Sequence, residues 1–372
     1  MKISIERAAL FRSLAHVQSV VERRNAIPIL SNVLMQARGG MLKLNTTDMD
    51  TSIIDSVEAY VTMEGGTTAP AHTLYDIVRK LPDGAHVDIT LEDGGNQISL
   101  RAGRSNFTLS CLPEDDFPTL QGDDLSHEFT IGADDLRAMI ERTRFAISSE
   151  ETRYYLNGIY WHAKEENGVK LMRAVATDGH RLARLEMPLP DGAEGMPGVI
   201  VPKKTVDTLY RLIAEDVTSV HVGLSEHKIR FAFDNIVLTS KLIDGTFPDY
   251  ERVIPAGNDK TMAVETRLFR EAVDRVSTIS SEKSRAVKLV LAEGNLMLQA
   301  ISPDAGSATE ELEIAYSSSE MEIGFNSVYL LDIAKQIEGE EIKFELADSG
   351  SPTIIRDMSD DGALYVLMPM RV

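Results

Sequence analysis

The sequence predicts an α+β protein in which one module, two helices against antiparallel strands, is repeated three times. At three places a short alternating strand runs directly into a helix, and the apolar stripe of that helix recurs at +5, +9, +12 and +15 from Ile5, Ile131 and Val264. A second block repeats as well, because residues 107–118 end the first module much as residues 237–248 end the second. Ordered matches of this kind indicate internal duplication. The predicted domains, each of a size that can hold its own core, are residues 1–124, 125–254 and 255–372.

The elements of the first module follow from hydrophobic periodicity. Residues 2–5 alternate as a strand, and residues 6–21 then have the spacing of an amphipathic helix. A second helix follows Pro70 and carries apolar side chains at helical spacing as far as Leu81. Helices on one face of an antiparallel sheet are typical of the α+β class. The remaining strands are predicted at residues 42–45, 51–57, 87–91, 98–102 and 107–112.

The second and third modules repeat this order. Pro202 opens the second helix of module two, and Asn326 takes the same place in module three. Connections rich in Gly, Asp and Pro lie near residues 121–126 and 255–260, where we place the domain boundaries. The strands after these helices are predicted at residues 217–224, 228–233, 236–242, 342–346, 353–356 and 363–369.

Composition narrows the class of protein. The hydrophobic share of 43% and the charged share of 26% are those of an ordinary globular chain. The single cysteine, Cys111, excludes an internal disulfide framework and favours a reducing compartment, so we expect a cytoplasmic location. The N-terminus has the pattern of a strand rather than a signal peptide, and no window approaches 18 uninterrupted apolar residues. We therefore expect no membrane partner.

Charge is predicted to be segregated between the elements. The formal net charge of -20 argues against a protein that binds phosphates over its whole surface. The six predicted helix segments together carry +2, which leaves -22 for the strands and loops. A helix layer that faces a polyanion would produce this pattern, and helices that are merely solvated would produce it equally well.

Nine segments spread along the whole chain carry a resemblance to a known family. They are residues 27–32 (IPILSN), 103–107 (GRSNF), 116–118 (DFP), 153–158 (RYYLNG), 176–182 (ATDGHRL), 240–245 (SKLIDG), 247–250 (FPDY), 321–326 (MEIGFN) and 366–371 (VLMPMR). In this order they closely resemble the bacterial β sliding clamp family, the processivity subunit of DNA polymerase III. The resemblance implies three clamp-type domains per chain and a head-to-tail homodimer, a six-domain ring with twelve helices around a hole that encircles duplex DNA. A closed ring needs only weak, sequence-blind phosphate contacts, which allow sliding.

The resemblance also implies which side chains face DNA. Cationic side chains would attract phosphates, whereas a histidine in the place of an arginine would contribute less while its imidazole is neutral. A pair of tyrosines could stack on bases of a single strand. Each of these side chains could instead be an ordinary solvated or packed residue. The matched positions are Arg24, His72, Arg79, Tyr154, Tyr155 and Lys204.

A larger set matches the family's peptide groove between the second and third domains. That groove receives a short extended peptide from the DNA polymerase III alpha subunit, the clamp loader delta subunit, and other polymerases and repair proteins. Aliphatic walls with methionines suit this role, because flexible thioethers repack around different apolar side chains, and polar residues would supply hydrogen bonds at the rim. The matched residues are Arg153, Leu156, Thr177, Gly179, His180, Arg181, Leu182, Pro248, Arg252, Val253, Asn326, Tyr329, Val366, Met368, Pro369, Met370 and Arg371. Taken without the resemblance, residues 368–370 would be only a strand end packed on a core.

The dimer seam is the third implied site. Phe107 and Leu109 lie on the last predicted strand of module one, and Thr278 and Ile279 lie at the end of the first helix of module three. In the family these regions meet across subunits. Pairing of edge strands between chains would also cover sheet edges that otherwise invite aggregation.

An enzyme is the main alternative class, and the sequence argues against it. Asp178 and His180 could form a catalytic pair and Cys111 could be a nucleophile, but no P-loop, dinucleotide motif, nucleophile elbow or metal-ligand spacing supports either reading. We predict no catalytic activity, no cofactor and no metal. Two rival functions stay open: an acidic repeat scaffold that binds only proteins, and a hydrolase with a diffuse active site.

Overall fold

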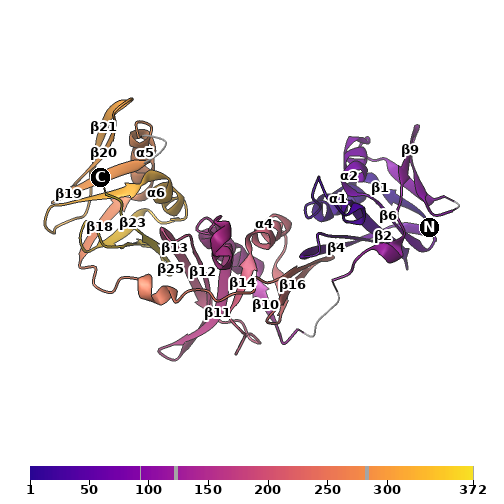
Figure 1. Ribbon diagram of the computed structural model, residues 1–372, viewed down its shortest axis with the longest axis horizontal. Helices are drawn as coiled ribbons and strands as arrows, with labels where there is room; N and C mark the ends of the chain where they lie inside the picture. The colour runs from indigo at the N-terminus through magenta and orange to yellow at the C-terminus, as the bar shows by residue number, and fades with distance from the viewer. Residues whose placement is uncertain (93, 121–124, 281–284, 372) are drawn as a thin grey trace. The chain divides into compact units, whose positions relative to one another are not determined.

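The computed structural model describes residues 1–92, 94–120, 125–280 and 285–371 (Figure 1). This part of the chain has six α-helices and 25 strands; the strands form four sheets, and every strand pair is antiparallel. The α+β class and the antiparallel sheets predicted from the sequence are therefore confirmed.

Apolar helical segments in the described residues are all too short or too polar to cross a membrane.

The N-terminal sheet has five strands and lies beside the first two helices (Figure 1). Helix α1 (Arg7–Val17) packs against helix α2 (Ala71–Lys80) through a buried stripe that includes Leu10 and Leu14. Ser19 donates its hydroxyl hydrogen to the carbonyl of His16 at 2.8 Å, and such side-chain bonds compete with helix continuation. This helix therefore ends at Val17 instead of the predicted Val21. In sheet order the strands are β5 (Tyr60–Met63), β1 (Lys2–Glu6), β7 (His86–Leu91), β8 (Gln97–Ala102) and β9 (Ser105–Ser110).

A first eight-stranded sheet joins strands from two modules. Strand β17 of the second module pairs with β4 of the first, from Ile236 opposite Asp55 to Ser240 opposite Thr51. The sheet is continuous across the predicted domain boundary because this pairing supplies the backbone hydrogen bonds that an edge strand would otherwise lack. Its strands, in order, are β10 (His127–Gly132), β15 (Ser219–Leu224), β16 (Lys228–Phe233), β17 (Ile236–Lys241), β4 (Thr51–Glu58), β3 (Met41–Thr47), β2 (Asn32–Arg38) and β6 (Gly65–Pro70).

A second eight-stranded sheet joins strands of the second and third modules in the same way. Strand β13 pairs with β25, from Arg181 opposite Leu367 to Leu185 opposite Ala363. This sheet carries the candidate groove described below. Its strands, in order, are β14 (Val199–Pro202), β11 (Gly158–Glu166), β12 (Val169–Thr177), β13 (Arg181–Pro188), β25 (Asp360–Leu367), β24 (Thr353–Asp357), β23 (Glu341–Leu346) and β18 (Lys260–Glu265).

The C-terminal part adds a four-stranded sheet and two helices that pack on each other. Helix α5 (Thr266–Ser277) begins where the Glu265 carboxylate accepts hydrogen bonds from two backbone N–H groups, and α6 (Ser327–Ala334) begins where Asn326 accepts one. The strands of this sheet are β21 (Gly306–Glu313), β20 (Asn295–Ser302), β19 (Ala286–Ala292) and β22 (Met321–Asn326). The two remaining helices are α3 (Ala133–Arg144) and α4 (Lys203–Leu212).

The chain divides into two compact units, although its repeats number three. Each eight-stranded sheet draws on two neighbouring modules, so the middle module is divided between the units. The predicted boundary after residue 124 falls outside the described residues, and the boundary after residue 254 follows the short helix η4 (Tyr250–Val253). The units are Met1–Asp134 with Pro190–Met196 and Asp207–Leu242, and Asp135–Leu189 with Pro197–Val206 and Ile243–Val372.

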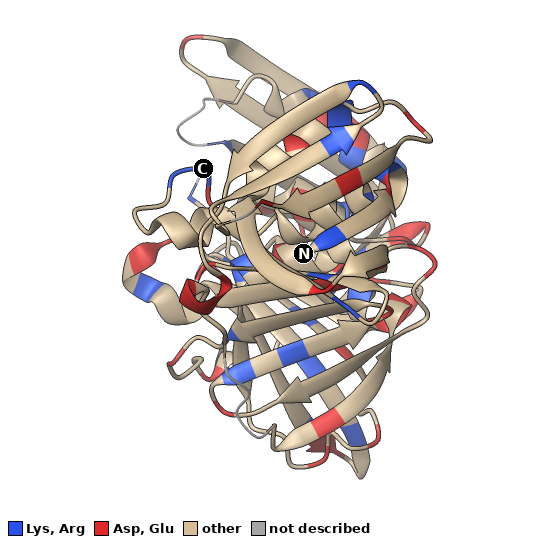
Figure 2. Ribbon diagram, turned by 90° about the vertical axis from the view of Figure 1, so that its right-hand side faces the viewer, with Lys and Arg blue, Asp and Glu red and all other residues tan. Residues whose placement is uncertain are grey.

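Charge is segregated between helices and the rest of the chain more strongly than predicted. Within their observed bounds the six described α-helices carry +2, +1, 0, +2, +1 and -1 in chain order, or +5 together. Since the whole chain carries -20, the remainder carries -25. Figure 2 shows acidic residues at many of the loops that join the strands.

Candidate functional site

An apolar cluster covers one face of the second eight-stranded sheet. Leu182, Val366 and Ile354 are successive cross-strand partners, so their side chains lie on the same face. The segment of residues 243–254 lies over them, and its Phe247 ring stacks on Tyr160 at 4.8 Å. The buried members are Leu156, Val175, Leu182, Ile200, Phe247, Tyr250, Ile354, Leu364 and Val366, with Tyr155, Tyr160, Ile243 and Ile254 packed against them.

Predicted groove residues therefore fall into two groups. Leu156, Leu182 and Val366 are at most 4% exposed and form the floor of the cluster rather than a free surface. Val253 and Met368 are 51% and 40% exposed, so they present apolar side chains to solvent. Exposed apolar side chains next to a packed apolar cluster are suited to bind another chain.

The loop between β12 and β13 holds the C-terminal segment. The Thr177 hydroxyl donates to the carbonyl of Arg181 at 2.7 Å and accepts from the N–H of Gly179 at 3.1 Å. Gly179 has φ of +88°, a conformation that favours glycine. The N–H of Met368 donates to the carbonyl of His180 at 2.9 Å, and that of Met370 donates to Gly324 at 2.8 Å. Residues 368–370 are thus tied at two points.

Arg181 was expected to offer hydrogen bonds at the rim, but its side chain is only 10% exposed. Its guanidinium donates to Asp178 at 3.1 Å, to Asp332 at 2.7 Å and to the carbonyl of Phe145 at 2.7 Å. It also lies 4.3 Å from the centre of the Tyr329 ring. These contacts connect the loop to α6 and engage all three guanidinium nitrogens of Arg181.

Other predicted rim residues already have partners. Arg153 pairs with Glu150 at 2.8 Å, and Arg252 pairs with Asp249 at 2.7 Å. Hydrogen bonding from Thr152, followed by the charge of Arg153, lowers the pKa of Glu150.

The remaining rim residues are placed as follows. Asn326 uses its side-chain oxygen to cap α6, and the exposed His180 ring stacks on Tyr329 at 6.2 Å. Pro248 and Arg371 are exposed, and Pro369 and Met370 are partly exposed.

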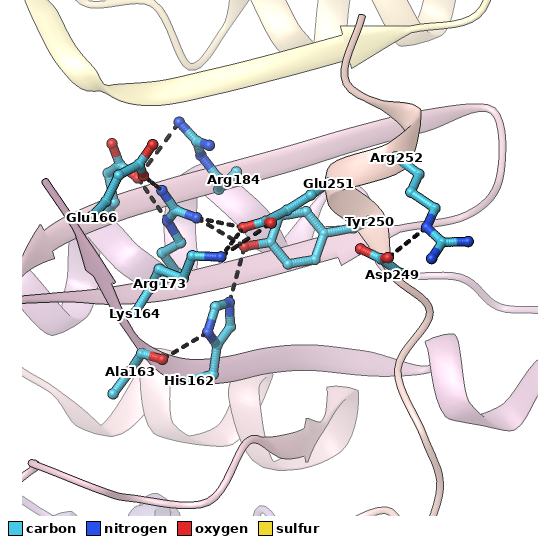
Figure 3. Close-up of polar contacts among 11 residues, drawn as sticks. His162, Ala163, Lys164, Glu166, Arg173, Arg184, Asp249, Tyr250, Glu251 and Arg252 are labelled. Carbon is cyan, nitrogen blue, oxygen red and sulfur yellow. Dashed lines mark hydrogen bonds and ion pairs between the residues drawn. The ribbon is translucent and has the colours of Figure 1, made fainter.

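A charged cluster around Arg173 lies on the same face of this sheet and was not predicted (Figure 3). The Arg173 side chain is 3% exposed, and its guanidinium donates to Glu186 at 2.8 Å, to Glu251 at 2.9 Å and to Glu166. It also donates to the Tyr250 hydroxyl oxygen at 3.4 Å. His162, Lys164 and Glu166 stand at alternate positions of β11 and so share a face, but Glu165 between them obscures this signal in the sequence.

The cluster's protonation states follow from its contacts. Burial by itself lowers the pKa of Arg173. The hydrogen bond and charge of Tyr250 and the charge of Glu186 raise this pKa by more, so the net pKa of Arg173 is raised. Burial lowers the pKa of His162, which favours its neutral form. The Nδ1 of His162 faces the carbonyl of Ala163, so Nε2 accepts from the Tyr250 hydroxyl at 3.0 Å. A hydrogen bond from Lys164 lowers the pKa of Glu251.

The residues expected to face DNA differ in exposure and in their contacts within the protein. Arg24 and Lys204 are exposed, and Arg79 is exposed but pairs with Asp76 at 3.1 Å. His72 donates from Nε2 to the carbonyl of Val21 at 2.9 Å, so that nitrogen is occupied by the protein.

The two tyrosines differ in the same way. Tyr154 is 54% exposed, whereas Tyr155 packs against the apolar cluster. Tyr154 is therefore the more accessible of the two rings, and it contacts Tyr155 edge-on with the ring centres 5.8 Å apart.

A basic hollow on the helices of the third module was missed. It has a volume of about 340 Å³ and is lined by Arg267, Arg270, Glu271, Asp274, Leu331 and Lys335. The net charge of the predicted helix segment balanced to zero, which hid the fact that α5 and α6 bring three cations to one place.

The seam residues lie at or near sheet edges. Strand β9, with Phe107 and the 9% exposed Leu109, is an edge of the five-stranded sheet, and β21 is an edge of the four-stranded sheet. Thr278 caps the C-terminal end of α5 and is exposed, and Ile279 follows it.

The residues considered for catalysis are engaged structurally. The Asp178 carboxylate accepts from the N–H groups of His180 and Arg181 and thereby shapes the loop. Cys111 is buried, and burial raises the pKa of its thiol, so the nucleophilic thiolate is disfavoured.

Comparison with known proteins gives consistent matches over the whole chain. Residues 1–121, 130–249 and 251–371 match the N-terminal, central and C-terminal domains of the DNA polymerase III beta subunit. A beta sliding clamp of Caulobacter vibrioides is 52% identical over 372 residues, covering 100% of both chains. A crystal structure of the Caulobacter crescentus beta sliding clamp, with PEG at a putative beta-motif tethering region, has a TM-score of 0.98 at 52% identity and 100% and 99% coverage. A Bartonella birtlesii sliding clamp bound to griselimycin has a TM-score of 0.97 at 48% identity, covering 100% of both chains.

Proposed function

This chain belongs to the DNA polymerase III beta subunit family, the sliding clamps, and we propose that two copies join head to tail in a ring around duplex DNA. The family is a processivity factor and not a catalytic subunit. We place its three clamp domains at residues 1–124, 125–254 and 255–372, and the matched family ranges support these bounds. In a ring, topology would retain the protein on DNA, while weak phosphate contacts would let it slide. We also infer a cytoplasmic location, where replication takes place.

Two edge strands support closure of the ring. Strands β9 and β21 end their sheets with one side unpaired within the described chain, and pairing between two copies would satisfy both. We infer that Phe107, Leu109, Thr278 and Ile279 lie at this seam. A mass in dilute solution of twice 41.0 kDa is expected, and a single-chain mass at micromolar concentration would contradict closure.

The observation that carries the proposal is the apolar cluster, with the exposed Val253 and Met368 in the segments that follow its members Tyr250 and Val366. We propose that it receives extended peptides from the DNA polymerase III alpha subunit, the clamp loader delta subunit, and other polymerases and repair proteins. A flexible thioether such as that of Met368 can adapt to different apolar side chains, which suits a shared groove.

DNA contact is assigned to exposed cations on or near the helices. Arg24, Arg79, Lys204 and the basic hollow on α5 and α6 are the candidates, with Tyr154 as a stacking residue. Arg24→Ala is expected to slow loading onto DNA and to lower the salt dependence of DNA binding by about one phosphate contact, with an unchanged circular dichroism spectrum. Val169→Ala, an exposed change on β12, is the control and should load normally.

The decisive experiment compares circular with linear DNA. The chain is loaded by clamp loader and ATP on a closed plasmid, and retention is measured before and after the plasmid is cut. Retention that is lost on linearisation supports topological linkage, because affinity alone would be the same for both forms. Equal loss from both forms would instead favour the alternative, an acidic repeat scaffold that binds only proteins.

A further inference from the structure

The segment that we take as one wall of the proposed peptide groove is short and has few backbone hydrogen bonds of its own. Residues 249–253 contain η4 and carry the half-exposed Val253. Two backbone hydrogen bonds of this turn, from Arg252 to Asp249 and from Ile254 to Glu251, are 3.4 and 3.3 Å long. Typical bonds of this type are about 2.9–3.0 Å long. The position of this wall therefore depends on side-chain anchors.

Two consecutive side chains supply these anchors, and both lead to Arg173 (Figure 3). The Tyr250 ring belongs to the apolar cluster, while its hydroxyl contacts Arg173 and His162. The Glu251 carboxylate accepts from Arg173 at 2.9 Å and from Lys164 at 2.8 Å. One guanidinium thus holds two neighbouring residues of the wall.

Arg173 is itself fixed by the sheet beneath. Its Nε donates to Glu186 on β13, and its Nη2 donates to Glu166 on β11. The planar fork of an arginine makes several charge-assisted bonds in a defined geometry, which a lysine does not reproduce. The guanidinium is therefore a rigid link from β11, β12 and β13 to the wall.

We propose that Arg173 is a positioning residue for the peptide groove, which, through Tyr250 and Glu251, fixes residues 249–253 and so presents Val253 to the bound peptide. The inference rests on the proposed function of the groove. Arg173 touches no peptide in this account, and its effect is on the order of the wall. Buried ion pairs commonly add little net stability, so a positional role is the better explanation of four partners on one side chain.

The test uses variants that release the wall without emptying the core. Glu251→Gln removes the ion pairs with Arg173 and Lys164, and Tyr250→Phe removes one hydroxyl while keeping the ring. Glu345→Gln is the matched control, since Glu345 pairs with Lys343 and Arg356 on the same sheet. The probe is a fluorescein-labelled peptide copying the clamp-binding segment of the DNA polymerase III alpha subunit, with the dissociation constant measured by anisotropy on the full-length protein.

We expect Glu251→Gln to weaken peptide binding about five- to tenfold, Tyr250→Phe about threefold, and Glu345→Gln less than twofold. Amide hydrogen exchange of residues 250–254 should accelerate in the first two variants and stay unchanged in the control. In an Arg173→Lys background, Glu251→Gln should cost less than it does in the wild type, because both act through one link.

The inference would be overturned by wild-type affinity in both wall variants, by equal weakening in the control, or by full additivity with Arg173→Lys. Failure of the wild-type protein to bind the peptide at all would count against the proposed function instead. Loss of affinity that follows a lowered unfolding temperature, with unchanged exchange at residues 250–254, would also reject the positional role.

Discussion

The two junctions between modules are both formed by an antiparallel strand pair, but the surfaces around them differ. Strand β17 pairs with β4 at the first junction and β13 with β25 at the second, both antiparallel. At the first junction Asp55 faces α1, where it meets His16 at 2.7 Å, so Ile54 lies on the opposite face and is half-buried. At the second junction Leu182 and Val366 are 2% and 3% exposed beneath the segment of residues 243–254.

The difference lies in where the segment that ends each module goes. After the first module, Glu114 accepts from the amide of Gln36 on β2 at 3.1 Å, so that segment lies near β2 and β6. After the second, Phe247 and Tyr250 pack across the junction itself. Similar sequence blocks therefore yield two surfaces, because the closing segment covers apolar residues of the junction only in the second case.

Among changes at the second junction, removal of the C-terminal segment is expected to have the largest effect on peptide binding. Deleting residues 368–372 should abolish peptide binding and polymerase stimulation, because Met368 and its hydrogen bond to the loop at His180 are lost. The dimer mass should stay unchanged, as measured by light scattering, since the seam residues are elsewhere. Normal polymerase stimulation by the shortened protein would reject the groove assignment.

Matched truncations at the two junctions compare their burial directly. Leu182→Ala should lower the free energy of unfolding by about 3 kcal/mol, because it leaves a cavity in the apolar cluster. Ile54→Ala, at a half-buried position of the first junction, should lower it by about 1 kcal/mol. Urea unfolding measures both. Equal losses would show that the covering segment adds no packing to the second junction.

Loop strain gives a smaller effect that is specific to the second junction. Gly179→Ala forces a side chain into φ of +88°, which should lower the free energy of unfolding by about 1–2 kcal/mol. A new Cβ would also lie 2.8 Å from Nη1 of Arg153, although that flexible end can move. Peptide affinity should fall as well. Gly40→Ala, also at positive φ but with open space around it, is the control that separates strain from groove function.

The pH dependence is the smallest expected effect. Since burial lowers the folded-state pKa of His162, the unfolded chain takes up a proton first as the pH falls below the ordinary value of 6.5. The corresponding stability is present above 6.5 and is lost as the pH falls through the lowered pKa. His162→Asn should flatten this part of a stability-against-pH curve. An identical slope in wild type and variant would show that His162 does not titrate with unfolding.

The groove residues show how far sequence reasoning could reach. The resemblance led to Leu182, Val366 and Met368, which the structure brings together on or beside one sheet face. Arg173 could not be found this way, since an isolated arginine in a strand gives no sign of which carboxylates will surround it. Arg181 is the opposite case. The sequence suggested a solvent-facing hydrogen-bond donor, but its side chain bonds to Asp332 and to the carbonyl of Phe145 and is largely buried.

From the sequence alone came the threefold repeat, the α+β class and the acidic bias outside the helices, because periodicity and charge are local properties of the chain. Tertiary structure alone decided which strands join across modules, why three repeats make two compact units, and which carboxylates surround Arg173. The physical reason is that strand pairing and burial depend on residues far apart in the chain, here Leu182 with Val366 and Arg173 with Glu251.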